Sequence, residues 1–544
     1  MTAADVLVAE LKTRDVPFIA TLNGHGLDPF YLACQRAGMR MIDVRNEQAA
    51  GYMAEVTGRL SRSVGVCAVS GAVAHANGLT GVLNAWFDGA PMLLITGMTP
   101  LARLGYGDFQ DFNPVPMAAP ICKYSRILDV PERTRQIVHD AFEAALSGRP
   151  GPVHLALPMD VAAAEVDEKQ IPQSRIKSGA VRHGGAAEQE LIDEAARQLR
   201  RAQRPVLIAG SGVYYACGET ALASFVKQQR IPTLIPNWDR GSIVERLEPF
   251  MGVVGSASGS PEILPDADLV ILAGVEFDYR VGQLEPPIIG AGTDIIRIHS
   301  DASRLRQGAD VGLSIQASPA KAMEQLTEAC RQLSCPPCEE WLREAQLRRD
   351  EFRERCRTAA DNLRYGINGR DVVDVLAGVL TDETVVLVDG GNIGQWFHQL
   401  ALDRYPGHWV SCGASGVIGW GLPGAMAARG LYPNRPIILL SGDGSFTFTV
   451  AELECAARQR LPFVCIVADD ECWGISVTGQ RKRYGHPLYS DLGPTRLDLV
   501  AEGFGCRGIR VEQLDQLQRE IEAGLAADRP TVIHVPIVHG GPND

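Results

Sequence analysis

The sequence lacks several features that mark whole classes of protein. Its 544 residues contain no apolar run near the ~20 residues that a membrane-spanning helix needs. Acidic residues outnumber basic ones by 65 to 52, and the net charge of −13 argues against a nucleic-acid partner. The opening stretch MTAADVLVAELKTRD carries acids and predicts an amphipathic helix instead of a secretory leader. We therefore expect neither a membrane nor a nucleic acid among its partners.

Disulfides, cysteine-rich metal sites and a complete dinucleotide fingerprint are not indicated either. Thirteen cysteines without a secretory leader favour reduced thiols and a cytoplasmic location. Cys335 and Cys338 form a single CxxC in a proline-containing connector, and no second pair lies at metal-ligand spacing. Gly210-Ser-Gly212 is a lone GxG after a predicted strand, and a dinucleotide site would need more glycines in register.

What the sequence does have is three blocks in which apolar strands alternate with helices. The blocks are residues 1–165, 191–335 and 336–544, and the polar, Gly- and Ser-rich stretch 166–190 predicts a linker. Within the last block a helix is predicted over 449–460. The alternation predicts the fold class α/β, with three doubly wound parallel-sheet domains. Strands are expected at 40–44, 64–69, 91–95, 152–157, 205–209, 269–273, 295–299, 385–389, 436–440 and 463–468.

Two of these strands end in acidic residues. The run 436–440 leads into Gly442-Asp443-Gly444, whose glycines permit a sharp turn and let backbone N–H groups approach an anion. The run 463–468 leads into Asp469-Asp470. Because the carboxyl ends of parallel strands lie at one sheet edge, Asp443 and Asp470 are predicted to lie side by side. Two carboxylates beside a glycine turn suit Mg²⁺ and a diphosphate, although an ordinary turn aspartate in an α/β unit is the alternative.

This stretch resembles the Gly-Asp-Gly…Asn signature of the thiamine-diphosphate (ThDP) enzymes. The resemblance implies that the side chains of Asp443 and Asp470 and the backbone carbonyl of Cys472 bind Mg²⁺. Asp470 stands where the family usually has Asn, and since Asp is also an oxygen ligand we expect binding to survive with one more negative charge. The diphosphate is expected at Gly442, Asp443, Gly444 and Ser445.

A second match lies in the first block, where Glu47 opens a helix after the strand 40–44. By position alone Glu47 compensates the helix dipole. By resemblance it is the glutamate that faces N1′ of the aminopyrimidine and drives its amino–imino tautomers. The stretch 69–78 looks like the family's loop on the pyrimidine and contains Asn77, which we expect to bind cofactor. His75 in this stretch is either catalytic or a packed histidine.

Two further stretches of the last block complete the expected cofactor site. Asn392 follows a strand and a Gly-rich turn whose N–H groups suit the diphosphate. The stretch 412–423 looks like the family's loop under the cofactor. There the resemblance gives Ile418 the role of wedge between the two cofactor rings and gives the Gly416 carbonyl a hydrogen bond from the 4′-amino group.

The substrate-facing residues are expected in the first block. The stretches 108–111 and 116–123 resemble acetolactate synthase and, more closely, benzaldehyde lyase, which makes Gln110 the leading substrate-pocket residue. His25 lies in the matching loop before the first helix and serves either proton transfer or loop lining. Trp473 either lines the pocket or packs.

The resemblance implies a ThDP- and Mg²⁺-dependent C–C lyase or carboligase acting through a C2-carbanion/enamine intermediate on 2-keto acids, aldehydes or 2-hydroxy ketones. The alternatives are an acetolactate-synthase-like enzyme consuming pyruvate, supported by Phe109, Gln110 and Lys123, and a 2-hydroxyacyl-CoA or oxalyl-CoA lyase, supported by the stretch 45–50. A fourth is a non-catalytic binding subunit.

The same resemblance carries expectations about cofactors and assembly. In this family the active site lies between two chains, so we expect at least a homodimer and favour a homotetramer. FAD in the central block is possible but not favoured, with Arg280 its only weak support.

Overall fold

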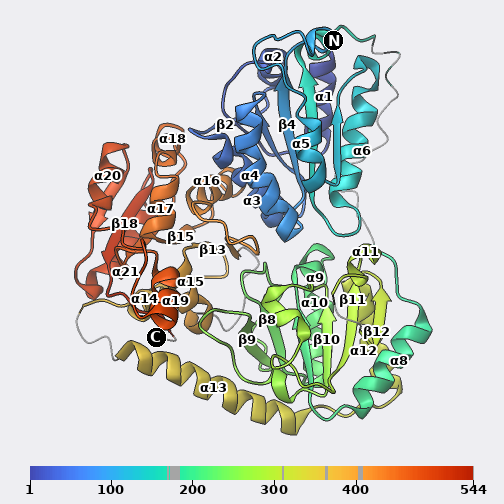
Figure 1. Cartoon of the computed structure of the whole chain (residues 1–544), viewed down its shortest axis with the longest axis vertical. Helices are drawn as coiled ribbons and strands as arrows, with labels where there is room; N and C mark the ends of the chain where they lie inside the picture. Colours follow the sequence, from blue (N-terminus) through green and yellow to red (C-terminus); the bar gives the residue numbers. More distant parts are fainter. Residues whose placement is uncertain are drawn as a thin grey trace.

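The computed structural model describes residues 1–167, 169, 171, 184–308, 311–361, 366–401 and 409–542. Over these ranges the strands form three sheets of six strands each, and every strand pair within a sheet is parallel (Figure 1). Helices cover both faces of each sheet, so the predicted α/β class with three parallel-sheet domains is confirmed. No helix within the described ranges is long and apolar enough to cross a membrane.

The first sheet has the strand order β2-β1-β3-β4-β6-β5. Its strands are β1 (Ile19–Thr21), β2 (Met41–Asp43), β3 (Gly65–Val69), β4 (Met92–Met98), β5 (Tyr124–Ile127) and β6 (Pro152–Pro158). The helices of this domain are α1 (Ala3–Thr13), α2 (Asp28–Ala37), α3 (Glu47–Ser61), α4 (Val73–Asp88), α5 (Val115–Ala118), α6 (Thr134–Leu146) and α7 (Met159–Ala163).

The central sheet has the order β12-β11-β10-β7-β8-β9. Its strands are β7 (Pro205–Ala209), β8 (Thr233–Pro236), β9 (Phe250–Val254), β10 (Leu269–Ala273), β11 (Asp294–His299) and β12 (Leu313–Gln316). Its helices are α8 (Gln189–Arg201), α9 (Ser211–Tyr215), α10 (Glu219–Gln229), α11 (Ala302–Leu305) and α12 (Pro319–Gln332).

The last sheet has the order β14-β13-β15-β16-β18-β17, the same plan as the first sheet. Its strands are β13 (Val385–Asp389), β14 (Trp409–Ser411), β15 (Ile437–Gly442), β16 (Val464–Asp469), β17 (Arg507–Arg510) and β18 (Thr531–Pro536). The helices after the central sheet are α13 (Glu339–Asp361), α14 (Gly369–Val379), α15 (Gly391–Trp396), α16 (Gly421–Leu431), α17 (Asp443–Phe448), α18 (Glu452–Arg458), α19 (Gly474–Tyr484), α20 (Leu497–Gly503) and α21 (Leu514–Leu525).

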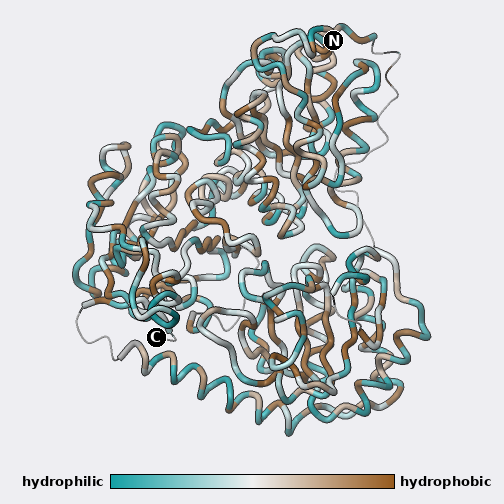
Figure 2. Tube along the Cα trace, in the orientation of Figure 1, coloured by the Kyte–Doolittle hydropathy of each residue, from teal (hydrophilic) through white to brown (hydrophobic). Residues whose placement is uncertain are grey.

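Hydrophobic residues are concentrated in the strands, and α13 is largely hydrophilic along its length (Figure 2). Apolar runs of this kind are typical of parallel strands that are buried on both faces. The first and last domains share one core, in which α3 packs on α16 through Met53, Val56, Leu422 and Met426. The helix α13 leads from the central to the last domain, and its Trp341 packs into the core of the central sheet.

The structure differs from the sequence-based expectations in two places near the predicted site. The helix expected over 449–460 is shorter, because the chain leaves helical geometry at Thr449 and α18 begins only at Glu452; a separate helix, α17, already begins at Asp443. The stretch 69–78, expected as a loop, becomes α4 from Val73 onward, since its buried positions repeat with helical spacing and face the sheet. Asn77 therefore lies on a helix.

Candidate active site

Four neighbouring strands of the last sheet bring polar residues to one edge. In the order β13, β15, β16, β18, the strands are followed by Asn392, Asp443, Asp470 and His539 respectively. Neighbouring strands pair in parallel register, so their carboxyl ends lie together. The structure thus brings together the three predicted residues of this set and adds His539, which the sequence analysis did not single out.

Asp443 and Asp470 interact across the ends of β15 and β16. Burial, and then the neighbouring carboxylates of Asp470 and Asp469, raise the pKa of Asp443 to about 8. A cluster of partly buried carboxylates favours either protonation or a bound cation. A hard divalent cation with oxygen ligands would remove this repulsion, so the donor set fits Mg²⁺.

The two adjacent aspartates after β16 have separate partners. The Asp469 carboxylate lies 2.7 Å from Nε2 of His534 and accepts a hydrogen bond from the backbone N–H of Glu471 at 3.0 Å. The Asp470 carboxylate instead faces the Asn392 side-chain amide, with an Nδ2–Oδ2 distance of 3.3 Å. Asp470, and not Asp469, is therefore the residue of this pair that lies beside the predicted diphosphate-binding asparagine.

The Gly-Asp-Gly turn is closely packed on all sides. A Cβ on Gly444 would lie 2.4 Å from the Trp473 ring, so this ring packs over the turn. Gly390 has a φ of 149°, and a Cβ there would lie 2.6 Å from the backbone N of Gly442. Only glycine allows the ends of β13 and β15 to approach this closely. Trp473 thus packs on the predicted diphosphate turn.

Asp389, at the end of β13, lies beside Ser445, the residue that follows this turn, and was not predicted from the sequence. Its carboxylate accepts hydrogen bonds from the backbone N–H of Gly421, at 2.6 Å, and from the Ser445 hydroxyl. Burial raises the pKa of Asp389 to about 7. The side chain of Ser445 therefore lies beside Asp389, at the turn predicted to hold the diphosphate.

The loop 412–420 carries Gly416 and Ile418 and is held by the two other domains. The N–H of Ala414 donates to Asp88 Oδ1 of α4 at 2.8 Å, and the Tyr279 hydroxyl of the central domain donates to the Ala414 carbonyl at 3.0 Å. Gly416 is exposed with a φ of 70°, and Ile418 is half-buried. Their predicted contacts with the cofactor rings thus depend on the position of Asp88.

Replacing Gly413 by alanine is expected to displace this loop. A Cβ at Gly413 would lie 1.8 Å from Asp88 Oδ2, and its φ of 93° is unfavourable for alanine. We expect Gly413→Ala to weaken ThDP binding, measured by fluorescence titration of the purified protein. Gly105→Ala is the control, because it also has a positive φ, of 86°, but meets nothing within 4 Å. Equal affinities in the two variants would contradict the role given to Gly413.

The first domain presents Glu47 at the start of α3. Asn46 caps this helix by accepting a hydrogen bond from the N–H of Gln48 at 2.9 Å, which fixes Glu47 at the first helical position. The Asn77 amide of α4 donates to Glu47 Oε2 at 3.0 Å. From the last domain, Glu452 accepts from the backbone N–H of Arg45 at 3.0 Å. The structure thus joins two predicted residues, Glu47 and Asn77.

Three loops of the first domain meet at the predicted substrate residues. His25 and Phe109 are in edge-to-face contact with ring centroids 5.2 Å apart. A Cβ on Gly24 would lie 2.7 Å from Ser70, so the loop after β1 packs on the loop after β3. Gln110 has a φ of 56°, and its buried Oε1 lacks a hydrogen-bond partner among the described residues. An unpartnered buried amide oxygen beside a half-buried histidine is suited to a ligand.

His75 belongs to the interior of the first domain. Its Nδ1 lies 2.8 Å from the Thr96 hydroxyl, which in turn lies 3.1 Å from Nε2 of His154. Burial lowers the pKa of His75 to about 4. Of the two roles considered for His75, this environment favours the packed histidine.

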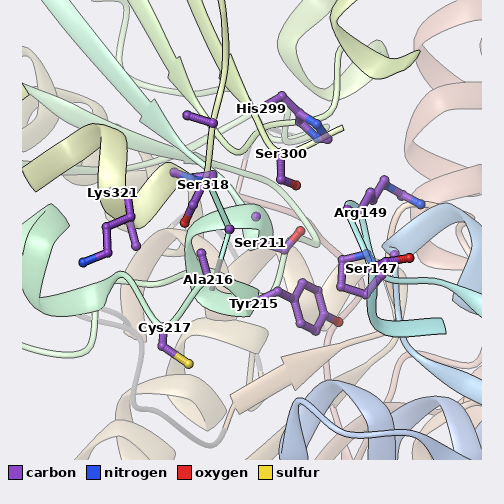
Figure 3. Close-up of a pocket in the computed structure, with 18 of the residues that line it drawn as sticks. Ser147, Arg149, Ser211, Tyr215, Ala216, Cys217, His299, Ser300, Ser318 and Lys321 are labelled. Carbon is purple, nitrogen blue, oxygen red and sulfur yellow. The ribbon is translucent and has the colours of Figure 1, made fainter. Parts of the chain in front are cut away.

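The central domain contains a cavity of about 780 Å³ at its boundary with the first domain (Figure 3). It is lined by Ser211 and Tyr215 of α9, by His299 at the end of β11 and Ser300 after it, and by Lys321 of α12. The volume is within the range of small-molecule sites.

Two sequence features near this cavity have structural roles. A Cβ on Gly212 would lie 2.7 Å from Gly274, so the GxG turn packs directly against the backbone after β10. The Arg280 guanidinium is buried, and it pairs with Asp278 at 2.8 Å and with Asp239 at 3.7 Å. Arg280 was the weak sequence support for FAD, and in the structure its charge is taken up by these two aspartates.

The side chain of Lys123 binds backbone carbonyls between α6 and β6. Its Nζ donates to the carbonyls of Ser147, at 2.5 Å, and Arg149, at 2.7 Å. Burial lowers the pKa of Lys123 to about 8. The sequence analysis took Lys123 as support for a pyruvate-consuming enzyme, but in the structure this lysine fastens the loop between α6 and β6.

Comparison with known proteins agrees with this geometry. Sequence models of the thiamine pyrophosphate enzymes match all three domains: the N-terminal TPP binding domain at residues 1–117, the central domain at 192–326, and the C-terminal TPP binding domain at 389–535. Together they cover most of the chain.

Proteins of two named activities are similar to this chain over nearly its whole length. The acetolactate synthase isozyme 1 large subunit of Escherichia coli is 27% identical, over 98% of this chain and 94% of that protein. The 2-hydroxyacyl-CoA lyase 2 of Caenorhabditis elegans is 28% identical, over 96% of this chain and 87% of that protein. A probable acetolactate synthase of Mycobacterium bovis is 26% identical, over 98% and 95%. With all three of its domains matched, the chain belongs to the thiamine pyrophosphate enzyme family and is an enzyme of the acetolactate synthase/2-hydroxyacyl-CoA lyase type.

Proposed function

We propose that this enzyme is a Mg²⁺-dependent lyase or carboligase that breaks or makes the C–C bond next to a carbonyl group, with aldehydes, 2-keto acids or 2-hydroxy ketones as substrates. The observation that carries the proposal is the contact of His25 with Phe109, from the loop that also carries Gln110, whose buried amide oxygen is left for a ligand. ThDP, when bound, supplies the carbanion-stabilising centre for this chemistry.

The residues of the chain have separable tasks in this proposal. Asp443, Asp470 and the Cys472 carbonyl would hold Mg²⁺, and Asn392 the diphosphate. Glu47 would exchange a proton with the aminopyrimidine while Asn77 keeps its carboxylate in place through the 3.0 Å hydrogen bond. Gln110 would orient the substrate oxygen, and His25 would exchange a proton with the substrate.

The rim of the substrate loops carries exposed apolar side chains beside the Arg103–Asp108 ion pair, and these apolar side chains favour aldehydes and hydroxy ketones with apolar or aromatic substituents. Tyr106, Phe109 and Met117 are exposed, Phe109 by 70%. The basic residues of the stretches that resemble the rival enzymes already have partners. Lys123 is bound to backbone carbonyls, and Arg45 pairs with Glu454 at 2.5 Å.

The active unit in this proposal is at least a homodimer and, by closed symmetry, a homotetramer made of two such dimers. Large apolar side chains are exposed beside both halves of the site. Val73, which is 73% exposed, and Phe109 belong to the first domain, and Phe448 and Ile475 to the last. Exposed apolar surface of this kind marks an interface, and a second chain would cover it.

A second candidate is the condensation of pyruvate, and a third is the cleavage of 2-hydroxyacyl-CoA. The names of the similar proteins support both, because acetolactate synthases and 2-hydroxyacyl-CoA lyases match this chain at nearly equal identity. The apolar side chains at the rim and the bound state of Lys123 support our choice of an aldehyde lyase as the first candidate.

Product analysis separates these candidates. We expect the protein supplied with ThDP and Mg²⁺ to cleave benzoin-type ketones and to form them from aldehydes. Removal of Mg²⁺ with a chelator should abolish turnover, and added Mg²⁺ should restore it. Acetolactate formed from pyruvate, or aldehyde released from a 2-hydroxyacyl-CoA, without benzoin turnover would replace the first candidate by the second or third. Turnover that does not depend on ThDP would contradict the proposal as a whole.

A further inference from the structure

The segment 537–542 that follows β18, here termed the β18 extension, lies across the edge of the last sheet. The N–H of Ile537 donates to the Asp469 carbonyl at 2.8 Å, and the N–H of Val538 donates to the Ile367 carbonyl at 2.7 Å. The Gly540 carbonyl accepts from Asn392 Nδ2 at 3.1 Å and from Trp396 Nε1 at 3.0 Å. The extension is therefore fastened to residues on both sides of the predicted diphosphate position.

This path places His539 against two of the predicted magnesium residues. His539 Nδ1 lies 2.9 Å from Asp470 Oδ2 and 3.2 Å from Cys472 Sγ. One ligand atom of each residue lies within 4.8 Å of those of the other two. His539 Nε2 is buried and has no hydrogen-bond partner among the described residues, so no other contact fixes the ring orientation through that nitrogen.

We propose that Asp470, Cys472 and His539 form a site for a thiophilic divalent cation such as Zn²⁺, and that its occupation excludes Mg²⁺ and ThDP from the same sheet edge. A thiolate, an imidazole and a carboxylate are the ligands that Zn²⁺ takes in proteins, whereas Mg²⁺ prefers oxygen ligands alone. Three protein ligands leave the fourth position for water, as in open zinc sites.

The geometry needs only a small adjustment to hold such an ion. Tetrahedral bonds of about 2.0–2.3 Å require ligand atoms roughly 3.3–3.8 Å apart. The 2.9 Å and 3.2 Å separations are slightly shorter, so the three side chains must move outward by fractions of an ångström. The Cys472 thiol loses its proton to solvent as the metal–sulfur bond forms, and no electron is transferred.

Two contacts explain why the two cation states exclude each other. Asp470 would be a ligand in both, so one carboxylate is shared. The Asn392 amide, predicted to bind the diphosphate, is occupied by the Gly540 carbonyl while the β18 extension is in place. Release of the extension would free Asn392 and remove His539 together. This exclusion rests on the proposed cofactor site, whereas the cation site itself does not.

Co²⁺ titration of the cofactor-free protein tests the site. A cysteine ligand gives a sulfur-to-cobalt charge-transfer band in the near ultraviolet, and tetrahedral Co²⁺ gives strong visible bands. We expect both bands in the unmodified protein. Cys472→Ser should lose the charge-transfer band, and His539→Ala should weaken Co²⁺ binding by at least the ~10–100-fold that follows loss of even an outer-sphere partner. Cys506→Ser and His486→Ala are matched controls, because neither residue belongs to the cluster. The Cys506 thiol donates to the Leu453 carbonyl, and His486 is exposed.

Three outcomes are decisive. Absence of the charge-transfer band in the unmodified protein, or its persistence in Cys472→Ser, overturns the cation site. If the site behaves as expected but ThDP with Mg²⁺ does not displace Co²⁺, the exclusion is overturned. If the protein binds no ThDP, the proposed function fails while the Co²⁺ spectra still decide the site. Circular dichroism of each variant verifies that the fold is retained.

Discussion

Replacing Glu47 by glutamine is expected to lower turnover by about 10²–10⁴-fold while the fold and ThDP binding are retained. The amide has nearly the shape of the carboxylate, and its oxygen can still accept the 3.0 Å hydrogen bond from Asn77. It cannot, however, exchange a proton with the aminopyrimidine at neutral pH. Steady-state rates and fluorescence titration with ThDP measure the two properties separately. A rate close to that of the unmodified enzyme would remove Glu47 from the mechanism.

Glu190→Gln is the control for this substitution, because Glu190 is exposed in the first turn of α8, far in sequence from the site, and should leave both properties unchanged.

Mixing inactive Glu47→Gln with inactive Asp443→Asn tests whether the site is shared between two chains. If each site takes Glu47 from one chain and Asp443 from the other, a mixed dimer holds one intact site. Activity should then return after subunit exchange, and its failure to return would argue for sites within single chains.

Arg59→Met is expected to reduce the free energy of unfolding by about 3–5 kcal/mol, because it leaves buried carboxylates without their counter-charge. The side chain of Arg59 is 1% exposed. Its guanidinium contacts Glu55 at 3.2 Å and Asp88 at 3.5 Å, and donates to the Ser411 carbonyl at 2.7 Å. Burial alone would lower the pKa of Arg59, but these two carboxylates raise it overall, so the cation is firmly held.

Denaturant midpoints of the purified variants measure this loss. Arg200→Met provides the control, because Arg200 lies exposed on α8 and should change stability little. The double variant Glu55→Gln, Arg59→Met should recover part of the loss, since burial raises the pKa of Glu55 to about 7 and the amide removes the remaining charge. If Arg59→Met unfolds at the same midpoint as Arg200→Met, the buried ion cluster is not what holds the domains together.

The residues at the strand ends of the candidate site could be predicted from the sequence, because the carboxyl ends of parallel strands lie at one edge of an α/β sheet. Asp443, Asp470 and Asn392 follow apolar runs, and the shared sheet edge brings them together. Glu47 and Asn77 were identified by resemblance, and their hydrogen bond was not foreseen. The helix at Asp443 was missed because a glycine pair reads as a turn, although Phe446 is buried and favours the helix.

The remaining parts of the site depend on contacts between distant segments. Asp88 and His539 lie in stretches without a motif, and Asp389 only precedes one. The partners of Asp389 and Asp88 are 32 and 326 residues away in the sequence. One signal was present, since Asp389 and His539 also follow apolar strands as Asp443 does. Conversely, Lys123 and Arg280 counted as support for pyruvate and for FAD because the sequence does not show which charges already have partners inside the protein.

The bond between the Ala414 N–H and the Asp88 carboxylate has a thermodynamic consequence. Asp88 also belongs to the ion cluster of Arg59, so the loop expected beneath the cofactor and the docking of the first domain on the last share one group. Two equilibria that share a group are linked, and linkage is reciprocal. If docking of the domains strengthens cofactor binding by a certain free energy, the bound cofactor stabilises the docked domains by the same free energy. In this enzyme, saturation with ThDP and resistance to unfolding are therefore two measures of one coupling.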